Sequence, residues 1–275
     1  MRKRHNNCKI LLVMILLGLR TSLFAEGTLD ELLRNWSSGT AYLLPAGRAE
    51  MGLFQPLRYG LNDAVEFSTH PLLCMQIPNL SLKWSHVFSA RFVMATRHSI
   101  YYPTPLLRTL AREGIGGMIS PEFHIPHMIS INNEVLVSKF AIDGHLFTGK
   151  VGINFAIKSA ELDERTTIDL PLLFPRLAVY YNGYGLRFGG DLQGKIIRRW
   201  NYLVDTDFFY FPGASENMAF EHKGLLLWTK SRRFQLCVGY KLSYSEYPFG
   251  TQWHLLGPIF DLQWARQLRG KSKYP

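Results

Sequence analysis

The chain has 275 residues, with 31 lysines and arginines against 21 aspartates and glutamates, which gives a formal charge of +10 at pH 7. Five of the basic residues and none of the acidic ones lie in residues 1–25, so 26 basic against 21 acidic residues remain in the rest of the chain. No basic stripe there could follow a phosphate backbone, which argues against nucleic acid as a partner. The length after residue 25 suits one large all-β domain.

The amino terminus has the pattern of a secretory signal peptide. A basic start precedes an unbroken apolar run from Ile10 to Leu19, whose ten residues fall within the ~7–15 of an apolar signal region. A helix of that length rises only ~15 Å, about half the thickness of a hydrocarbon core. We therefore predict cleavage after Ala25 and assign residues 1–25 to the signal peptide. An uncleaved membrane anchor is the alternative.

A short helix is expected directly after this leader. Thr28 and Glu31 have the spacing of a capping box, in which each side chain bonds to a backbone amide of the other residue. Apolar residues then repeat at helical spacing as far as Trp36. We interpret residues 26–46 as a periplasmic amino-terminal segment that contains this helix.

From Arg48 onward the dominant period of the sequence is two, as in β-strands. The clearest example is Phe234–Tyr244, where every second residue is apolar and the residues between them are polar or small. The expected strands begin near Arg48, Ala64, Leu80, Ala90, Ile131, Gly144, Val151, Leu177, Tyr184, Tyr202, Met218, Phe234 and Trp253.

The lengths of these segments favour a transmembrane β-barrel. Several reach about ten residues, which is enough to cross a membrane at a tilt of ~45°. Aromatic residues gather near segment ends, as in the girdles at membrane interfaces. We predict an antiparallel all-β barrel of about twelve strands over residues 47–265, with a basic tail at 266–275. Barrel strand numbers are usually even, so at least one of the thirteen starts is wrong. A secreted soluble β-protein is the alternative.

One stretch, residues 103–126, interrupts the alternation. Thr104-Pro105 offers an N-cap and a proline at the first helical position, and Gly114 would end the helix. A long insertion between barrel strands is either an extracellular loop or a constriction folded into the lumen.

The last strand carries a pattern found in a known class of proteins. Gly257-Pro258-Ile259-Phe260-Asp261-Leu262-Gln263-Trp264 resembles the carboxy-terminal insertion signal of outer-membrane barrel proteins, except that eleven residues follow Trp264. The resemblance implies a Gram-negative outer-membrane β-barrel that contacts outer-membrane lipids and is delivered by the barrel assembly machinery.

The polar faces of the expected strands carry the candidate functional residues. Asp205 and Asp207 share a face by parity, and so do Arg187 and Lys195 in the preceding segment, which predicts an ion-pair network in the lumen. Seven cations against three anions in a hydrated lumen would favour anions weakly. The expected pore-lining residues are Lys83, Arg91, Arg97, Lys158, Arg187, Asp191, Lys195, Asp205, Asp207 and Lys241.

The leading hypothesis is a passive or loop-gated pore for small hydrophilic solutes, with no cofactor and no metal. One alternative is a lipid-modifying hydrolase, suggested by His98-Ser99. However, neighbouring residues of a strand point to opposite faces, so His98 is badly placed to activate Ser99. A structural or adhesive barrel with a plugged lumen is the other alternative.

Two further features of the sequence have ordinary explanations. Glu122, His124 and His127 resemble metal-ligand spacing only loosely, because Pro126 breaks any helix that would bring them together. Outside the leader the chain has two cysteines, Cys74 and Cys237. They are expected to be unpaired thiols, with a disulfide as the alternative.

Overall fold

The computed structural model of the chain describes residues 36, 38–88, 92–141, 144–163, 166, 178–213, 216–247 and 250–268. The expected signal peptide, the helix start at Thr28–Glu31 and residues 269–275 of the tail lie outside these residues.

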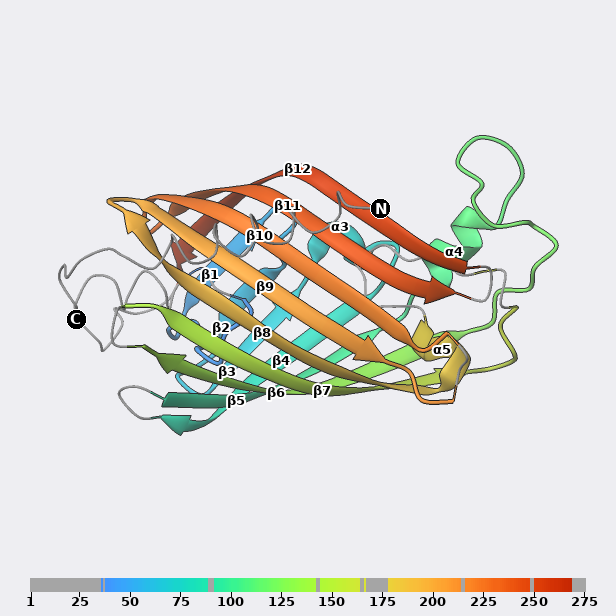
Figure 1. The fold of residues 1–275 in the computed structure, drawn as a ribbon, viewed down its shortest axis with the longest axis horizontal. Coiled ribbons are helices and arrows are strands. Elements are labelled where there is room, and N and C mark those ends of the chain that lie inside the picture. Colours follow the sequence, from blue (N-terminus) through green and yellow to red (C-terminus); the bar gives the residue numbers. More distant parts are fainter. Residues whose placement is uncertain are drawn as a thin grey trace, which may run out of the picture.

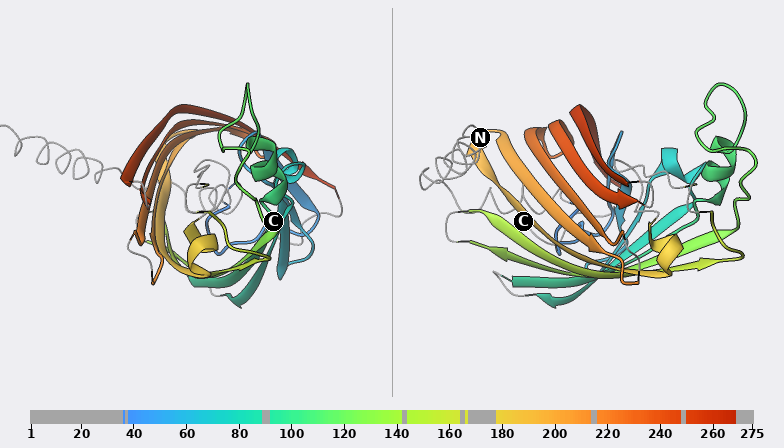
Figure 2. Two further views of the ribbon diagram at one scale, coloured as in Figure 1. Left: turned by 90° about the vertical axis from the view of Figure 1, so that its right-hand side faces the viewer. Right: turned by 45° about the vertical axis from the view of Figure 1, so that its right-hand side comes forward.

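The described residues form twelve antiparallel strands that close into one barrel, in which each strand pairs with its neighbours in sequence and β12 pairs with β1. Figure 1 shows the barrel from the side, and the left view of Figure 2 looks along its interior. Closure gives the backbone N–H and C=O groups of the wall partners within the sheet, as hydrocarbon requires. The strands are β1 (Arg48–Gly52), β2 (Leu57–Gly60), β3 (Val65–Thr69), β4 (Asn79–Phe88), β5 (Phe92–Tyr101), β6 (Met128–Phe140), β7 (Leu146–Lys158), β8 (Tyr184–Ile197), β9 (Trp200–Tyr210), β10 (Met218–Ser231), β11 (Phe234–Tyr247) and β12 (Gly250–Gln267).

The predicted fold class and strand number are confirmed, but three strand predictions were wrong. The starts expected near Gly144 and Val151 belong to the single strand β7. Where a strand was expected to begin near Leu177, Ala178–Asn182 forms the helix α5. The strand β2 was missed because its four residues are too few to show alternation.

The period of two has the predicted physical meaning. Phe188, Phe208 and Phe260 are exposed on the outer wall, whereas Asp191 and Asp207, on the opposite faces of the same strands, are buried inside the barrel. The apolar faces therefore point outward and the polar faces line the lumen, which is the reverse of a soluble β-sandwich.

The two ends of the barrel differ. At one end, on the left in Figure 1, two-residue turns join β8 to β9 and β10 to β11. We call this the short-turn end. The opposite long-loop end carries the long connections and their helices, and no helix among the described residues is long and apolar enough to cross a membrane. The helices are α3 (Pro71–Cys74), α4 (Thr104–Leu110) and α5 (Ala178–Asn182).

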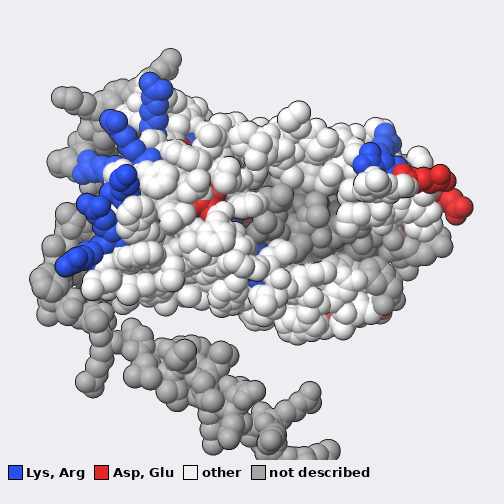
Figure 3. All heavy atoms as spheres, turned by 90° about the horizontal axis from the view of Figure 1, so that it is seen from above, with Lys and Arg blue, Asp and Glu red and all other residues white. Residues whose placement is uncertain are grey.

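Basic side chains gather at the short-turn end, as Figure 3 shows. The positive charge of the described barrel is thus concentrated at one rim instead of being spread along the wall. The exposed cations of this rim are Lys139, Arg198, Arg199, Lys230, Arg232, Arg233 and Arg266.

Candidate functional site

The interior of the barrel is filled near the short-turn end by residues 36 and 38–46, which we call the plug segment. Thr40 and Ala41 are fully buried, and Tyr42 and Leu44 are almost so. Ala41 and Tyr42 pack against an apolar patch of the inner wall formed by Val93, Ala95, Leu136 and Leu146. The plug segment is therefore packed inside the barrel, where the sequence predicted a periplasmic segment.

Side chains of the wall bind the backbone of the plug segment. Because the plug has no strand partner, its buried amides need other acceptors. Three plug amides donate to wall side chains, Trp36 to the Glu50 carboxylate (3.1 and 3.2 Å), Ala41 to Ser138 Oγ (2.8 Å) and Leu44 to Glu66 Oε2 (2.8 Å).

Lys83 binds the carbonyl groups of the plug, whereas the preceding wall side chains bind its amides. Its Nζ donates to the carbonyl oxygens of Ser38 (3.3 Å), Thr40 (3.0 Å) and Tyr42 (3.3 Å). An ammonium group has three N–H donors, so the plug backbone engages all of them. The nearest carboxylate oxygen, of Glu66, lies 3.6 Å from the same nitrogen. Lys83, an expected pore-lining residue, is therefore a plug anchor in this structure.

A buried ion cluster connects the strands behind the plug. The Arg58 guanidinium lies between Glu50 (3.3 Å) and Glu66 (2.8 and 2.9 Å). Arg48 Nε adds a second contact to Glu50 at 2.6 Å. The side chain of Arg58 is 1% exposed and that of Glu50 is 0% exposed. Each carboxylate thus receives hydrogen bonds from both the wall and the plug, which compensates its loss of hydration.

A second ion network lies between β5 and β10. Lys150 Nζ bonds to Asp205 and lies 3.4 Å from Asp207 and 3.9 Å from Asp191. Arg187 bonds to Asp207 at 2.6 Å. The network continues through Arg187 to Glu134, Glu134 to Arg97 (2.5 Å), and Asp205 to Lys223 (3.1 Å).

The ion-pair network predicted around Asp205 and Asp207 is present, although its composition differs. Arg187 is a partner as expected, but Lys150 and Lys223 bond to Asp205, and Lys195 does not take part in the described ion pairs. Lys241 pairs with Glu221 at 2.7 Å and Lys158 with Glu161 on the connection after β7. Arg91 lies outside the described residues.

Several charged residues of the lumen were missed in the sequence. Lys150 lies on the lumen side of β7, directly before the strand start expected at Val151. It could have been found by extending the alternation of that strand by one residue. Glu50 and Arg58 lie on strands of only five and four residues, where alternation gives little signal. The additional anions Glu50, Glu66, Glu134 and Glu221 largely offset the cation excess of the residues identified from the sequence.

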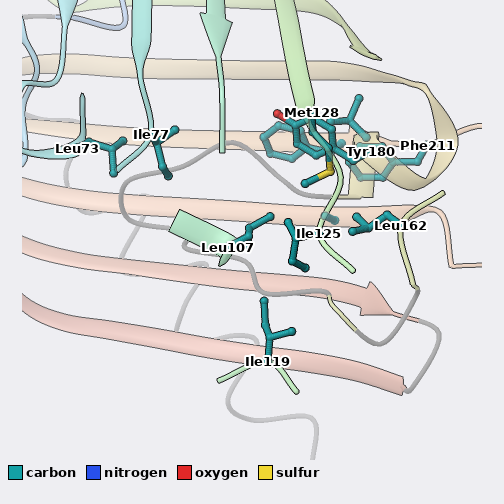
Figure 4. Packing of buried hydrophobic residues seen from close by; sticks show 12 residues of the cluster. Leu73, Ile77, Leu107, Ile119, Ile125, Met128, Leu162, Tyr180 and Phe211 are labelled. Atoms are coloured by element: carbon teal, nitrogen blue, oxygen red, sulfur yellow. The ribbon is translucent and has the colours of Figure 1, made fainter. Parts of the chain in front are cut away.

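The long-loop end is covered by an apolar cluster, which we call the cap (Figure 4). It joins α3, α4 and α5 to lumen-side residues of β6, β9 and β10. Segment 103–126, for which both an outer loop and a constriction were considered, thus packs against the barrel mouth through Leu107, Ile119 and Ile125. The core residues of the cap are Leu73, Ile77, Leu107, Ile119, Ile125, Met128, Leu162, Val179, Tyr180, Phe209, Phe211 and Ala219.

The expected helix in this segment starts and ends differently from its prediction. The residue that caps α4 is Pro103, not Thr104, and the helix ends at Leu110, before Gly114. The Thr104 hydroxyl donates to the Pro126 carbonyl (3.0 Å) and accepts from the Met128 amide (2.9 Å). This buried hydroxyl therefore links the first residue of α4 to the start of β6, so the two ends of the connection between β5 and β6 are held together.

His70 caps α3 at the long-loop end of the barrel. Its Nδ1 accepts a hydrogen bond from the Leu73 amide at 3.3 Å, which requires that nitrogen to be unprotonated. Burial lowers the pKa of His70 below its ordinary value, so the neutral form that caps the helix is favoured.

A cavity of about 270 Å³ lies between the plug segment and strands β8 to β12. Its walls combine amides and lysines with leucines, so that a small hydrophilic molecule would find hydrogen-bond partners there. Its lining includes Trp36, Ser38, Gln193, Lys223, Leu225 and Lys241.

The other residues considered from the sequence are not brought together as sites. His98 is exposed on the outer wall, while Ser99 is buried in the lumen and accepts from Ser81 Oγ at 2.7 Å. Among the described residues no three His, Cys, Asp or Glu side chains could share a metal ion. Cys74 and Cys237 are both free thiols.

The close approach of wall and plug at Gly60 allows a direct test of this packing. A Cβ atom at Gly60 would lie 2.3 Å from the Pro45 carbonyl oxygen and 2.6 Å from that of Leu44. Gly60→Ala should therefore lower the free energy of unfolding by about 1–3 kcal/mol, measured by urea unfolding in lipid vesicles.

Gly149→Ala is the matched control for that substitution, because a Cβ there would meet no atom within 4 Å. It should change the unfolding free energy by less than about 0.5 kcal/mol. Equal effects of the two substitutions would contradict the packing of the plug against β2.

No protein-family model and no curated protein matches the sequence. Solved structures with similar architecture include a bacterial polysaccharide outer membrane secretin (8% identity, 81% of this chain and 70% of that chain, TM-score 0.43). Others are OccK11 (OpdR) of Pseudomonas aeruginosa (10%, 80% and 62%, TM-score 0.38) and LpxR from Salmonella typhimurium (9%, 87% and 96%, TM-score 0.40).

Proposed function

We propose that this protein is a gated pore of the outer membrane for small hydrophilic solutes, and that the conformation described here is its closed state. The observation that supports the proposal is the plug segment, which occupies a polar lumen without belonging to the wall. Its backbone is held mainly by hydrogen bonds to single wall side chains, above all Lys83. Contacts of this kind can be exchanged for water when the segment leaves.

The proposal includes an orientation in the membrane. Short turns face the periplasm and longer loops the outside in outer-membrane barrels. The short-turn end is accordingly periplasmic, and the cap is extracellular. The apolar outer wall would contact outer-membrane lipids, and the Gly257–Trp264 pattern within β12 would be read by the barrel assembly machinery. The wall carries nearly balanced charges, so the proposed pore lacks the weak anion preference expected from the sequence.

Planar-bilayer recording tests this function. The mature protein should give rare conductance steps, since both the plug and the cap close the lumen. A protein that lacks residues 27–44 should open more often, and a protein that also has residues 104–124 replaced by a short Gly-Ser linker should open most. Each variant is first checked for the mobility shift on boiling that a folded barrel shows. If the folded double variant gives no steps, the pore is refuted and a plugged structural barrel takes its place.

A further inference from the structure

A hydrogen-bonded row of polar side chains lies on the outer wall of the barrel. Thr96 and His98 are two residues apart on β5, and Asn133 is opposite His98 on β6. His98 Nε2 lies 3.1 Å from Thr96 Oγ1, and His98 Nδ1 lies 2.7 Å from Asn133 Oδ1. Polar and ionisable groups that face a bilayer are costly and are most often functional. The fact that three of them meet on a mainly apolar wall therefore calls for a chemical explanation.

The directions of these hydrogen bonds follow from Asn133. Its Oδ1 can only accept, so Nδ1 of a neutral His98 carries the proton and Nε2 is the free acceptor. Thr96 Oγ1 then donates its proton to His98 Nε2. His86 Nε2 lies 2.8 Å from the same Thr96 oxygen and supplies an N–H to its lone pair. The row is thus a hydroxyl, a base that faces its proton, and a group that fixes the base in one tautomer.

Apolar side chains surround this row. Trp84 on β4 and Val135 on β6 lie opposite Thr96, and Leu82 lies opposite His98. All three are exposed to the exterior, and His98 itself is exposed. His98 is three residues from the long-loop end of β5, and the proposed site requires water to reach the row from that end. An acyl chain could lie on this apolar surface with its ester group at Thr96.

We propose that Thr96, His98 and Asn133 form an esterase site that cleaves ester-linked acyl chains of membrane lipids. Thr96 is the nucleophile, His98 the general base and Asn133 the positioning residue, the arrangement that activates a hydroxyl in nucleophilic catalysis. This activity is separate from the proposed pore, since the row is outside the barrel and the ion networks are inside.

The reaction balances with water as the second substrate. Thr96 Oγ bonds to the ester carbonyl carbon while its proton moves to His98 Nε2. The bond from that carbon to the alcohol oxygen then breaks, and the released alcohol takes the proton from His98. Water, deprotonated by His98, attacks the acyl-Thr96 ester, and the Oγ–acyl bond breaks as the threonine oxygen regains a proton. The products are one fatty acid and one alcohol. The His86 N–H beside Oγ is the donor nearest to the developing oxyanion.

A second His–Thr pair on the same wall provides a matched control. Thr206 Oγ1 lies 2.9 Å from His222 Nδ1, and His222 Nε2 lies 3.1 Å from the Tyr240 hydroxyl. A phenol can donate or accept, so Tyr240 does not fix the tautomer of His222 as Asn133 fixes that of His98. Thr206→Val therefore removes a comparable hydroxyl from the outer wall without touching the proposed site.

The test measures fatty acid released by the full mature protein from two kinds of vesicle. One kind contains phosphatidylethanolamine and phosphatidylglycerol, and the other contains lipopolysaccharide, which distinguishes phospholipid esters from those of lipid A. Wild type and Thr206→Val should release fatty acid equally. Thr96→Val and His98→Gln should be slower by at least about 100-fold, and Thr96→Ser should keep the activity. Asn133→Ala should lower kcat and move the acidic limb of the pH profile, which a purely structural role would not do.

Folding is checked for every variant by its mobility shift on boiling, and by conductance if the pore is confirmed. The esterase is refuted if wild type releases fatty acid from neither vesicle, or if folded Thr96→Val is as fast as wild type. A folded Thr96→Ser that falls to the rate of Thr96→Val also contradicts it, because a hydroxyl at this position should suffice. The bilayer recordings test the pore separately, so failure of the esterase test does not refute the pore.

Discussion

Replacement of Arg58 by methionine should lower the free energy of unfolding by about 3–5 kcal/mol, the usual effect of removing one partner from a buried ion cluster. Arg58 is the only cation between Glu50 and Glu66 within the described cluster that contacts both. Without it, two buried carboxylates repel each other across a space that water does not hydrate. Urea unfolding in lipid vesicles, followed by tryptophan fluorescence, measures the change.

Lys158→Met is the control for Arg58→Met, because it also removes a cation from an ion pair but at an open position. The partner of Lys158 is Glu161, which is 90% exposed. Exposed pairs contribute about 0–1 kcal/mol, so this variant should unfold almost as wild type does. A loss at Arg58 no larger than that at Lys158 would show that the cluster around Glu50 and Glu66 is hydrated.

Replacement of Lys83 by methionine should release the plug segment without unfolding the barrel. Three hydrogen bonds from the ammonium group to plug carbonyls are lost, while Glu66 keeps Arg58 as its partner. A loss of about 2–3 kcal/mol in plug docking, within the range for hydrogen bonds to charged groups, raises the released population roughly 30- to 150-fold. Hydrogen exchange of the amides in residues 38–46 measures this release directly.

Lys195→Met serves as the control for Lys83→Met. Lys195 is a half-buried lysine on the lumen side of β8 and donates no hydrogen bond to the described part of the plug. Its replacement should leave exchange in residues 38–46 unchanged. If Lys83→Met also leaves exchange unchanged, the plug is held by its apolar contacts with β5, β6 and β7 instead, and gating through Lys83 is excluded. Bilayer recording of the same variants shows whether release of the plug also increases conductance.

The sequence determined the wall of this protein. Alternation with a period of two is a local property, and it assigns each residue of a long strand to the outer or inner face whatever the strand pairs with. A barrel of about twelve strands, the outward phenylalanines and the inward position of Asp205 and Asp207 could therefore be predicted. Where a strand was too short to alternate, as in β2, the same reasoning gave nothing, and Arg58 went unnoticed.

Only the tertiary structure decided which inward charges meet and what lies between them. Lys150 and Asp205 are on strands that do not pair with each other, so their contact depends on the registers of β7, β8 and β9 and on barrel curvature. The plug segment has no periodicity, and its place is fixed by wall side chains such as Lys83. On the outer wall, Asn133 reaches His98 because the register of β5 and β6 sets them opposite each other. Contacts between residues distant in the chain follow from the register of the strands and the closure of the barrel. A local sequence pattern specifies neither of them.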